Sequence, residues 1–229
     1  MESVTKIPFF KEISGDLETP LSIYLKFMDD RNSYLFESVE GGEKWARYSI
    51  IGLPTDKKID LSKNPLKDIE NFLKQNKAQS IPDLPDFHGG LVGYFSYETI
   101  RHIEKKLQNS SKEKLPYPDI SLMVSDEVVI YDNLKKSLFI VVHGNEDTKK
   151  ECYERIELIH KKILEPLPSQ KPSKKGVINF ESSVKKEDYL EAIRKIKNYI
   201  VEGDVMQVVY GQEFSTKFEG SPIDLYRSL

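Results

Sequence analysis

The chain has 229 residues, with 34 lysines and arginines against 37 aspartates and glutamates, which gives a formal net charge of −3. This balance excludes a strongly basic surface, so we expect no nucleic-acid partner and no anionic membrane partner. The chain also has no apolar run near the roughly 20 residues that cross a bilayer, and MESVTKIPFFKE lacks a secretory apolar core. These features predict a cytoplasmic globular protein.

The first predicted elements are a helix and a hairpin. Thr19-Pro20 is typical of an N-cap followed by the first helical residue, and apolar residues recur with helical spacing from Leu21 to Met28. The stretch Tyr34–Gly52, YLFESVEGGEKWARYSIIG, has two β-rich runs around Gly41-Gly42, where a positive φ carries no steric cost. It therefore predicts a hairpin.

Alternating helices and strands follow. The sequence predicts a helix from Leu66 to Gln75 and a β region that begins at Gly89 after a proline-rich stretch. Two runs, 128–130 and 138–142, are separated by DNLKKS and indicate a second hairpin, and a polar helix is expected over 147–164.

The last third of the chain starts with a linker. Residues 166–176 are rich in Pro, Ser and Lys and have no apolar period. A helix is then predicted over the apolar positions from Leu190 to Ile200, with Gly203 as its C-terminal cap, followed by a strand from Val205 to Phe218. A further helix start at Ser221-Pro222 comes about two helical turns before the last residue, which favours a piece of a longer protein over a short terminal helix docked on the body.

Few residues outside the first hairpin indicate chemistry. The four histidines are scattered and Cys152 is the single cysteine, so we expect neither a zinc set nor a disulfide, and Cys152 is predicted to be a half-buried helical residue. The glycines of HGGLVGYFSYE lack the Lys-Ser or Lys-Thr of a phosphate loop and favour close backbone packing. Gln207 stands among Met206, Val208 and Val209, so it is either a polar residue on the exposed face of a strand or a buried amide that needs hydrogen-bond partners.

Glu37 and Ser38 allow two interpretations. They follow the apolar run Tyr34–Phe36, so they either end a strand in water or place an acid and a hydroxyl at a small-molecule site. Spacing alone does not decide between these possibilities.

Three segments in the same order carry a resemblance to a known family: FES with GG and ARYSIIG, within 34–52; GGLVGYFSYETIR, 89–101; and YIVEGDVMQVVYGQEF, 199–214. They resemble the large subunit, component I, of anthranilate synthase, in the chorismate-binding enzyme family. The resemblance implies an α+β fold of orthogonally packed, largely antiparallel sheets flanked by helices, incomplete in this chain. It implies a tryptophan-binding regulatory region over 1–165, a linker over 166–176, and the truncated start of the chorismate-binding domain over 177–229.

The resemblance also implies a function. The full-length enzyme would convert chorismate and ammonia, supplied from glutamine by an amidotransferase subunit, into anthranilate and pyruvate, under feedback inhibition by L-tryptophan. Ser38 lies on the family motif for this inhibitor; Glu37 would accept from its ammonium and Arg47 would meet its carboxylate. Gln207 lies on the active-site strand where water-adding relatives carry a lysine base, which favours the ammonia branch. The Mg²⁺ and chorismate ligands are expected beyond residue 229, so this span alone is expected to be inactive.

Two alternatives stay open. The parent enzyme could be the aminodeoxychorismate synthase subunit of the p-aminobenzoate pathway, although Glu37-Ser38 and the following ARYS resemble the anthranilate enzyme more closely. The chain could also be a non-catalytic tryptophan-binding module.

Overall fold

The computed structural model divides the chain into two compact units, Met1–Pro168 (unit 1) and Ser169–Leu229 (unit 2). The boundary lies inside the predicted linker, while the functional division of the chain stays a prediction. Each unit is described by itself. The structure describes residues 6–38, 47–107, 116–169 and 179–229.

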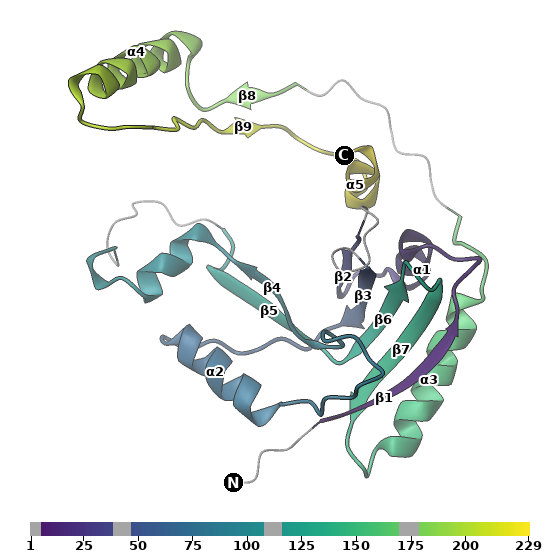
Figure 1. The fold of residues 1–229 in the computed structure, drawn as a ribbon. Helices are drawn as coiled ribbons and strands as arrows, with labels where there is room; N and C mark the ends of the chain where they lie inside the picture. Colours follow the sequence, from purple (N-terminus) through teal and green to yellow (C-terminus); the bar gives the residue numbers. More distant parts are fainter. Residues whose placement is uncertain (1–5, 39–46, 108–115, 170–178) are drawn as a thin grey trace. The chain divides into compact units, whose positions relative to one another are not determined.

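Unit 1 is organised around a five-stranded antiparallel sheet with the strand order β1-β7-β6-β3-β2 (Figure 1). Both predicted hairpins are present, because β2 pairs with β3 and β6 pairs with β7. The first strand of the chain pairs with the last strand of the sheet, with Ile7 opposite Gly144. The strands are β1 (Ile7–Ser14), β2 (Asn32–Phe36), β3 (Tyr48–Thr55), β6 (Glu127–Asp132) and β7 (Ser137–Gly144).

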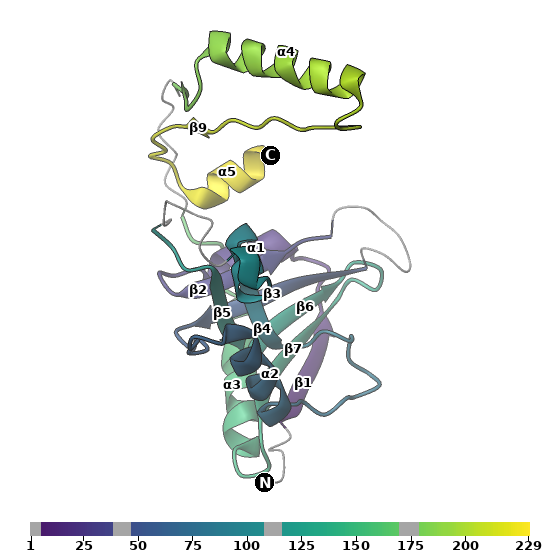
Figure 2. The same ribbon diagram turned by 90° about the vertical axis from the view of Figure 1, so that its left-hand side faces the viewer.

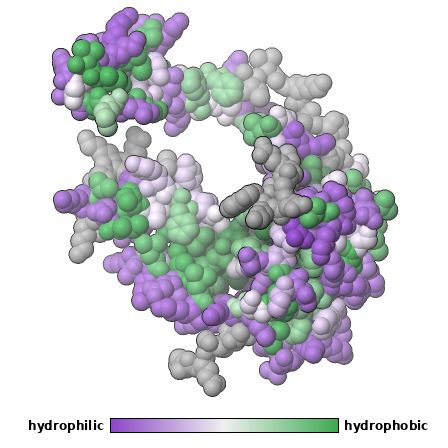
Figure 3. Space-filling model, viewed as in Figure 1, coloured by the Kyte–Doolittle hydropathy of each residue, from purple (hydrophilic) through white to green (hydrophobic). Residues whose placement is uncertain are grey.

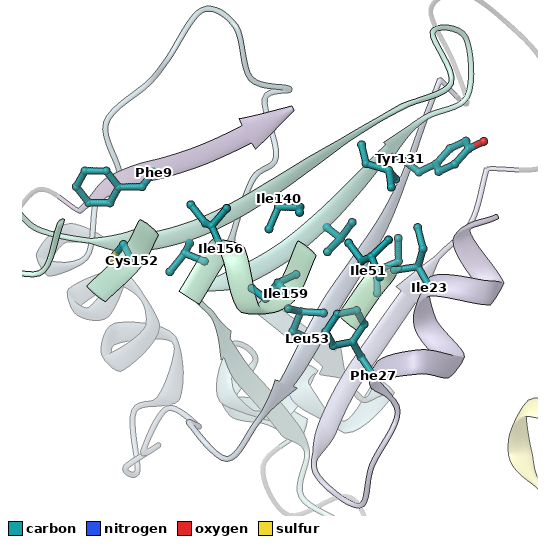
Figure 4. Close-up of a cluster of buried hydrophobic side chains, with 14 residues drawn as sticks. Phe9, Ile23, Phe27, Ile51, Leu53, Tyr131, Ile140, Cys152, Ile156 and Ile159 are labelled. Atoms are coloured by element: carbon teal, nitrogen blue, oxygen red, sulfur yellow. The ribbon is translucent and has the colours of Figure 1, made fainter. Parts of the chain in front are cut away.

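Both faces of this sheet are covered, which explains the unbroken apolar runs of its central strands. Side chains alternate between the faces along β6, so Val129 and Tyr131 join one core cluster while Val128 and Ile130 join another. The first cluster lies under two helices, which contribute Ile23, Phe27, Ile156 and Ile159 among others (Figure 4). These helices are α1 (Pro20–Phe27) and α3 (Lys149–Ile163).

The opposite face of the sheet packs against a two-stranded antiparallel ribbon, which contributes Val92 and Met123 to the second core cluster, and a helix lies on the same side (Figures 1 and 2). In the ribbon, a Cβ on Gly93 would lie 1.9 Å from the carbonyl oxygen of Ser121, and one on Gly89 would lie 2.5 Å from the His143 ring, so the expected close packing is confirmed at these two glycines. It is wrong for Gly90, where a Cβ would meet nothing within 4 Å. The predicted helix after residue 65 is present as well. These elements are α2 (Pro65–Gln75), β4 (Gly90–Phe95), β5 (Ile120–Ser125) and the 3₁₀ helices η1 (Tyr97–His102) and η2 (Lys105–Leu107).

The helix ends follow the sequence signals. At the start of α1, the Thr19 hydroxyl accepts from the Ser22 N–H at 3.0 Å, and the Ser22 hydroxyl accepts from the Thr19 N–H at 2.9 Å. Cys152 lies on α3 and is 5% exposed, so it is more deeply buried than expected.

Unit 2 contains two helices and a minimal ribbon. Its longer helix ends at Gly203, whose φ of 83° is left-handed, as the predicted cap requires. None of the described residues of unit 2 is buried, and hydrophobic side chains reach the surface of this helix (Figure 3). The elements are β8 (Glu181–Ser182), α4 (Lys186–Glu202), β9 (Phe214–Ser215) and α5 (Pro222–Ser228).

The predicted strand from Val205 to Phe218 is wrong over most of its length. Only Phe214 and Ser215 form a strand, and they pair with β8. A strand needs a continuous ladder of backbone partners, which the described part of unit 2 supplies only at those two residues. Met206 is consequently 97% exposed and Val209 is 85% exposed.

Candidate functional site

The candidate site lies at the end of the sheet where β2 ends and β3 begins. The Ser38 hydroxyl donates to the carbonyl oxygen of Tyr48 at 2.8 Å, and the Ser38 N–H donates to the hydroxyl of Ser49 at 3.0 Å. These bonds continue the β2–β3 pairing by two residues past Phe36. Ser38 is thereby fixed on β3, with its oxygen lone pairs still able to accept hydrogen bonds.

Arg47, immediately before β3, forms a two-pronged ion pair with Asp132 at the end of β6. Its Nε lies 3.1 and 3.0 Å from the two carboxylate oxygens, and its Nη2 lies 2.6 Å from Oδ2. The guanidinium carbon also lies 4.9 Å from the centre of the Tyr48 ring, within cation–π range. Two contacts thus fix the orientation of the guanidinium plane.

Asp132 is the buried member of this pair, because its side chain is 0% exposed while that of Arg47 is 26% exposed. Its Oδ1 also accepts from the N–H groups of Leu134 and Lys135, at 3.0 Å each. Burial by itself raises the pKa of the Asp132 carboxyl, but the bonds from Arg47 and from these backbone groups outweigh burial and lower that pKa. The carboxylate in turn raises the pKa of Arg47.

Asn133 directly follows Asp132 in the turn between β6 and β7, and it links this turn to Ser49. Its side-chain amide donates to the Ser49 hydroxyl at 3.1 Å, and its backbone N–H donates to the Arg47 carbonyl at 2.8 Å. Since the Ser49 hydroxyl is fully buried and also accepts from the Ser38 N–H, a chain of hydrogen bonds runs from Asn133 to Ser38. The structure therefore joins Ser38 and Arg47 through two adjacent residues of the β6–β7 turn.

The other predicted site residues are placed less closely. Glu37 is half-buried beside Ser38 at the end of β2. Gln207 lies in unit 2, where it is exposed and outside any strand, so the interpretation as a buried amide is wrong and the predicted strand around it does not form. The apolar residues around it face solvent because the strand that would have buried them does not form. The hairpin residues Gly41-Gly42 and Trp45 lie outside the described residues.

Sequence reasoning did not find Asp132, Asn133 or Ser49. The segment DNLKKS was interpreted only as a turn, and an Asp-Asn pair at a turn is an ordinary turn signal. The available clue was that Asp132 directly follows the apolar run Val128–Tyr131, so its carboxylate starts at the end of a buried strand. A buried carboxylate needs a cation, and Arg47 is that cation.

A separate cavity of about 360 Å³ lies at the opposite end of β3, around Thr55 and His143. Arg31, Lys57 and Arg155 line it, but their charges are matched by nearby acids: Asp29, Asp126 and Glu127, respectively. Within the described ranges, no group of three or more His, Cys, Asp or Glu side chains is arranged to hold a metal ion. None of the helices in the described part of the chain is both long enough and apolar enough to cross a membrane.

Comparison with known proteins agrees with the expected fold class. The chain resembles the crystal structure of anthranilate synthase component I from Streptococcus pneumoniae with a TM-score of 0.66. This match has 19% identity and covers 94% of the chain and 51% of that structure, so it supports the fold alone. The α+β architecture of antiparallel sheets flanked by helices is thereby confirmed.

The sequence comparisons are more specific. The chain is 40% identical to anthranilate synthase component 1 of Pseudomonas aeruginosa, a match over 100% of the chain and 52% of that protein. It is 34% identical to the component 1 of Acetivibrio thermocellus, over 97% of the chain and 51% of that protein. The chain thus spans about half the length of these curated relatives. Residues 31–229 match the family model described as chorismate binding enzyme, and the chain therefore belongs to the chorismate-binding enzyme family.

Proposed function

We propose that the chain is part of an anthranilate synthase component 1, and that the whole protein makes anthranilate from chorismate in tryptophan biosynthesis. The observation that carries this proposal is the similarity to component 1 proteins along the entire chain. It favours anthranilate synthase over aminodeoxychorismate synthase, because relatives from Pseudomonas, Acinetobacter and Neisseria all carry the anthranilate name. The second support is that Ser38 and Arg47 lie at the same end of the sheet, held by hydrogen bonds to β3 and β6.

In the proposed reaction, ammonia forms a bond to a chorismate ring carbon, and water and pyruvate leave to give anthranilate. A glutamine amidotransferase subunit supplies the ammonia, and Mg²⁺, when bound, neutralises chorismate charge. As the family resemblance implies, the residues that hold the ion would lie beyond residue 229. Gln207 fits the ammonia branch, because a neutral amide cannot remove a proton from water near neutral pH.

The proposed role of unit 1 is to bind L-tryptophan as a feedback inhibitor. A zwitterionic amino acid needs an acceptor for its ammonium and donors for its carboxylate, and Glu37, Ser38 and Arg47 supply these groups at one end of the sheet. Tryptophan would lower activity by binding more tightly to a less active arrangement of the whole protein. Residues 177–229 would then begin the chorismate-binding domain.

The proposal is tested by anthranilate fluorescence. The full-length protein is given chorismate, ammonium and Mg²⁺, with and without L-tryptophan. We expect anthranilate to form and tryptophan to suppress it, whereas aminodeoxychorismate as the product would contradict the assignment. The 229-residue chain alone is expected to fold but to form no anthranilate. Anthranilate formation by this chain would contradict the placement of the active-site ligands outside this span.

Two serines on the same hairpin strand provide a matched pair of variants. Ser38→Ala removes the hydroxyl at the candidate site, and Ser33→Ala removes a hydroxyl from β2 that contacts the Tyr24 hydroxyl at 3.2 Å. We expect Ser38→Ala to raise the half-inhibiting tryptophan concentration by about fivefold, the value of one hydrogen bond, and Ser33→Ala to leave it unchanged. Equal inhibition of both variants and the wild type would argue against the tryptophan site.

A further inference from the structure

The β6–β7 turn supports the candidate site through contacts that the binding residues cannot make by themselves. Among the described residues, the Asp132 carboxylate bonds to the guanidinium of Arg47 and to two backbone N–H groups, and its side chain has no exposed surface with which to meet a ligand. Asn133 reaches Ser38 only through Ser49. Any effect of either turn residue on a ligand must therefore pass through Arg47 or Ser38.

The geometry of the ion pair determines which edge of Arg47 faces a ligand. A planar guanidinium has two edges that each bind a carboxylate with two hydrogen bonds, one formed by Nε and Nη2 and one formed by Nη1 and Nη2. Asp132 takes the first edge. Nη1 forms no hydrogen bond within the described part of the chain, so the second edge, at the tip of the side chain, is the one that remains for a ligand carboxylate.

The contacts that hold the Arg47 guanidinium in place are rigid. Asp132 is held by two backbone N–H groups of its own turn, and the Tyr48 ring lies under the guanidinium of Arg47. Arg47 thereby loses its rotamer freedom during folding rather than during ligand binding. Ordering a long side chain only when the ligand binds costs about 0.5–1.5 kcal/mol, which corresponds to roughly a twofold to tenfold loss of affinity.

We propose that Asp132 and Asn133 are positioning residues for amino-acid recognition: Asp132 orients the end of Arg47 toward the ligand carboxylate, and Asn133 fixes Ser38 through Ser49. This inference rests on the proposed tryptophan site and adds to it two residues that do not touch the ligand. It also assigns a purpose to a buried ion pair whose worth to stability alone is small, because desolvation of the carboxylate offsets most of the attraction.

The test is tryptophan binding to the full-length protein, measured by calorimetry. Asp132→Asn keeps an oxygen for the backbone N–H groups but removes the charge that orients Arg47. Arg47→Gln and the double variant complete a double-mutant cycle with Asp132→Asn. Asn133→Ala tests the connection from Asn133 through Ser49 to Ser38, and it keeps the inference testable if Asp132→Asn does not fold.

Asp29→Asn is the matched control, because Asp29 forms the same side-on pair with Arg31, at 2.9 and 2.6 Å, on an exposed surface. Circular dichroism verifies the fold of each variant.

We expect Asp132→Asn and Asn133→Ala each to raise the tryptophan Kd several-fold, up to about tenfold. The double variant should bind no more weakly than Arg47→Gln alone, and Asp29→Asn should bind like the wild type. Wild-type affinity in both turn variants, with weak binding by Arg47→Gln, would overturn the inference and leave the tryptophan site standing. Failure of the wild-type protein to bind tryptophan would overturn the proposed regulation, and this inference with it.

Discussion

At the scale of single residues, the stacked imidazoles of His88 and His143 join the segment before β4 to the end of β7. The rings lie 5.2 Å apart at 17°, with 3.1 Å between Nδ1 of His88 and Nε2 of His143. Nδ1 of His143 lies 3.0 Å from the Asp126 carbonyl, which only accepts, so His143 carries its proton on Nδ1 and its Nε2 accepts from His88. This arrangement requires the His143 ring to be neutral, because the lone pair on its Nε2 accepts the hydrogen bond.

The pair predicts acid sensitivity near pH 6. Burial lowers the pKa of both histidines below the ordinary value of 6.5. The unfolded chain then binds more protons than the folded chain, so stability falls as the pH drops from about 6.5 toward the lowered values. We expect the urea midpoint to decrease between pH 7.5 and pH 5.5, and to decrease less in His143→Gln. An unchanged slope in His143→Gln would contradict the assignment. The lowered pKa of Asp126 affects stability only below about 3.8.

Which residues the sequence could identify depended on what each side chain contacts. Ser38 was recognisable from a motif, and the structure places it at the expected hairpin mouth with a defined hydrogen-bond pattern. Arg47 was predicted from its place in the second strand, but its partner Asp132 lies 85 positions away. Long-range pairing of this kind leaves no local pattern, so the sequence did not indicate that Asp132 pairs with Arg47.

At the scale of elements, Lys26 joins two helices that cover the same face of the sheet. It lies in the last turn of α1, and its side chain is only 5% exposed. Its ammonium pairs with Glu18 and donates to the Ile163 carbonyl at the end of α3, at 2.6 Å. A cation is favourable at a helix C-terminus, where carbonyl groups lack partners within the helix. The contact therefore connects α1 to α3 as well as neutralising Glu18.

Removing this cation is expected to be costly. Lys26→Met leaves the Glu18 carboxylate without its cation and a helix-end carbonyl without its donor, and such losses in buried pairs amount to about 3 kcal/mol of unfolding free energy. Urea unfolding followed by circular dichroism measures this change. Lys67→Met removes a cation from the exposed pair with Glu70 on α2 and should cause no measurable change. Similar stabilities for the two variants would mean that Lys26 does not join the helices.

Elements with local start and stop signals were predictable, and those that depend on distant partners were not. Thr19-Pro20 and Gly203 encode helix ends through their own backbone preferences, and the structure places caps at both. The apolar composition of Val205–Phe218 favoured a strand as clearly as those signals favoured the helix ends. Strand formation depends on a neighbouring backbone, however, and composition carries no information about whether that neighbour is present.

At the scale of the whole molecule, the two units differ in what they bury. Unit 1 contains two clusters of buried side chains, one on each face of its sheet. In unit 2, every described residue is at least partly exposed, and Val201 is 87% exposed on its longest helix. A 17-residue helix with no buried face is marginal by itself in water. The sequence indicated the boundary between the units through the linker composition, but not this difference in burial.

This difference predicts the behaviour of fragments. We expect residues 1–168 to unfold cooperatively, with a thermal midpoint close to that of the whole chain, because the core clusters lie entirely within them. Residues 169–229 should show weak helicity and no cooperative transition by circular dichroism. A cooperative transition in the second fragment, or a disordered first fragment, would contradict the assignment of stability to unit 1.

The sheet order also determines when unit 1 can fold during protein synthesis. Strand β1 is made first, yet its partner β7 follows roughly 130 residues later. At about 5–20 residues per second, β1 leaves the ribosome on the order of ten seconds before β7 is complete. During that interval the apolar segment IPFF has no partner in the sheet. Lys11 and Glu12, the next residues of β1, place charge beside it, which discourages pairing with other nascent chains until β7 arrives.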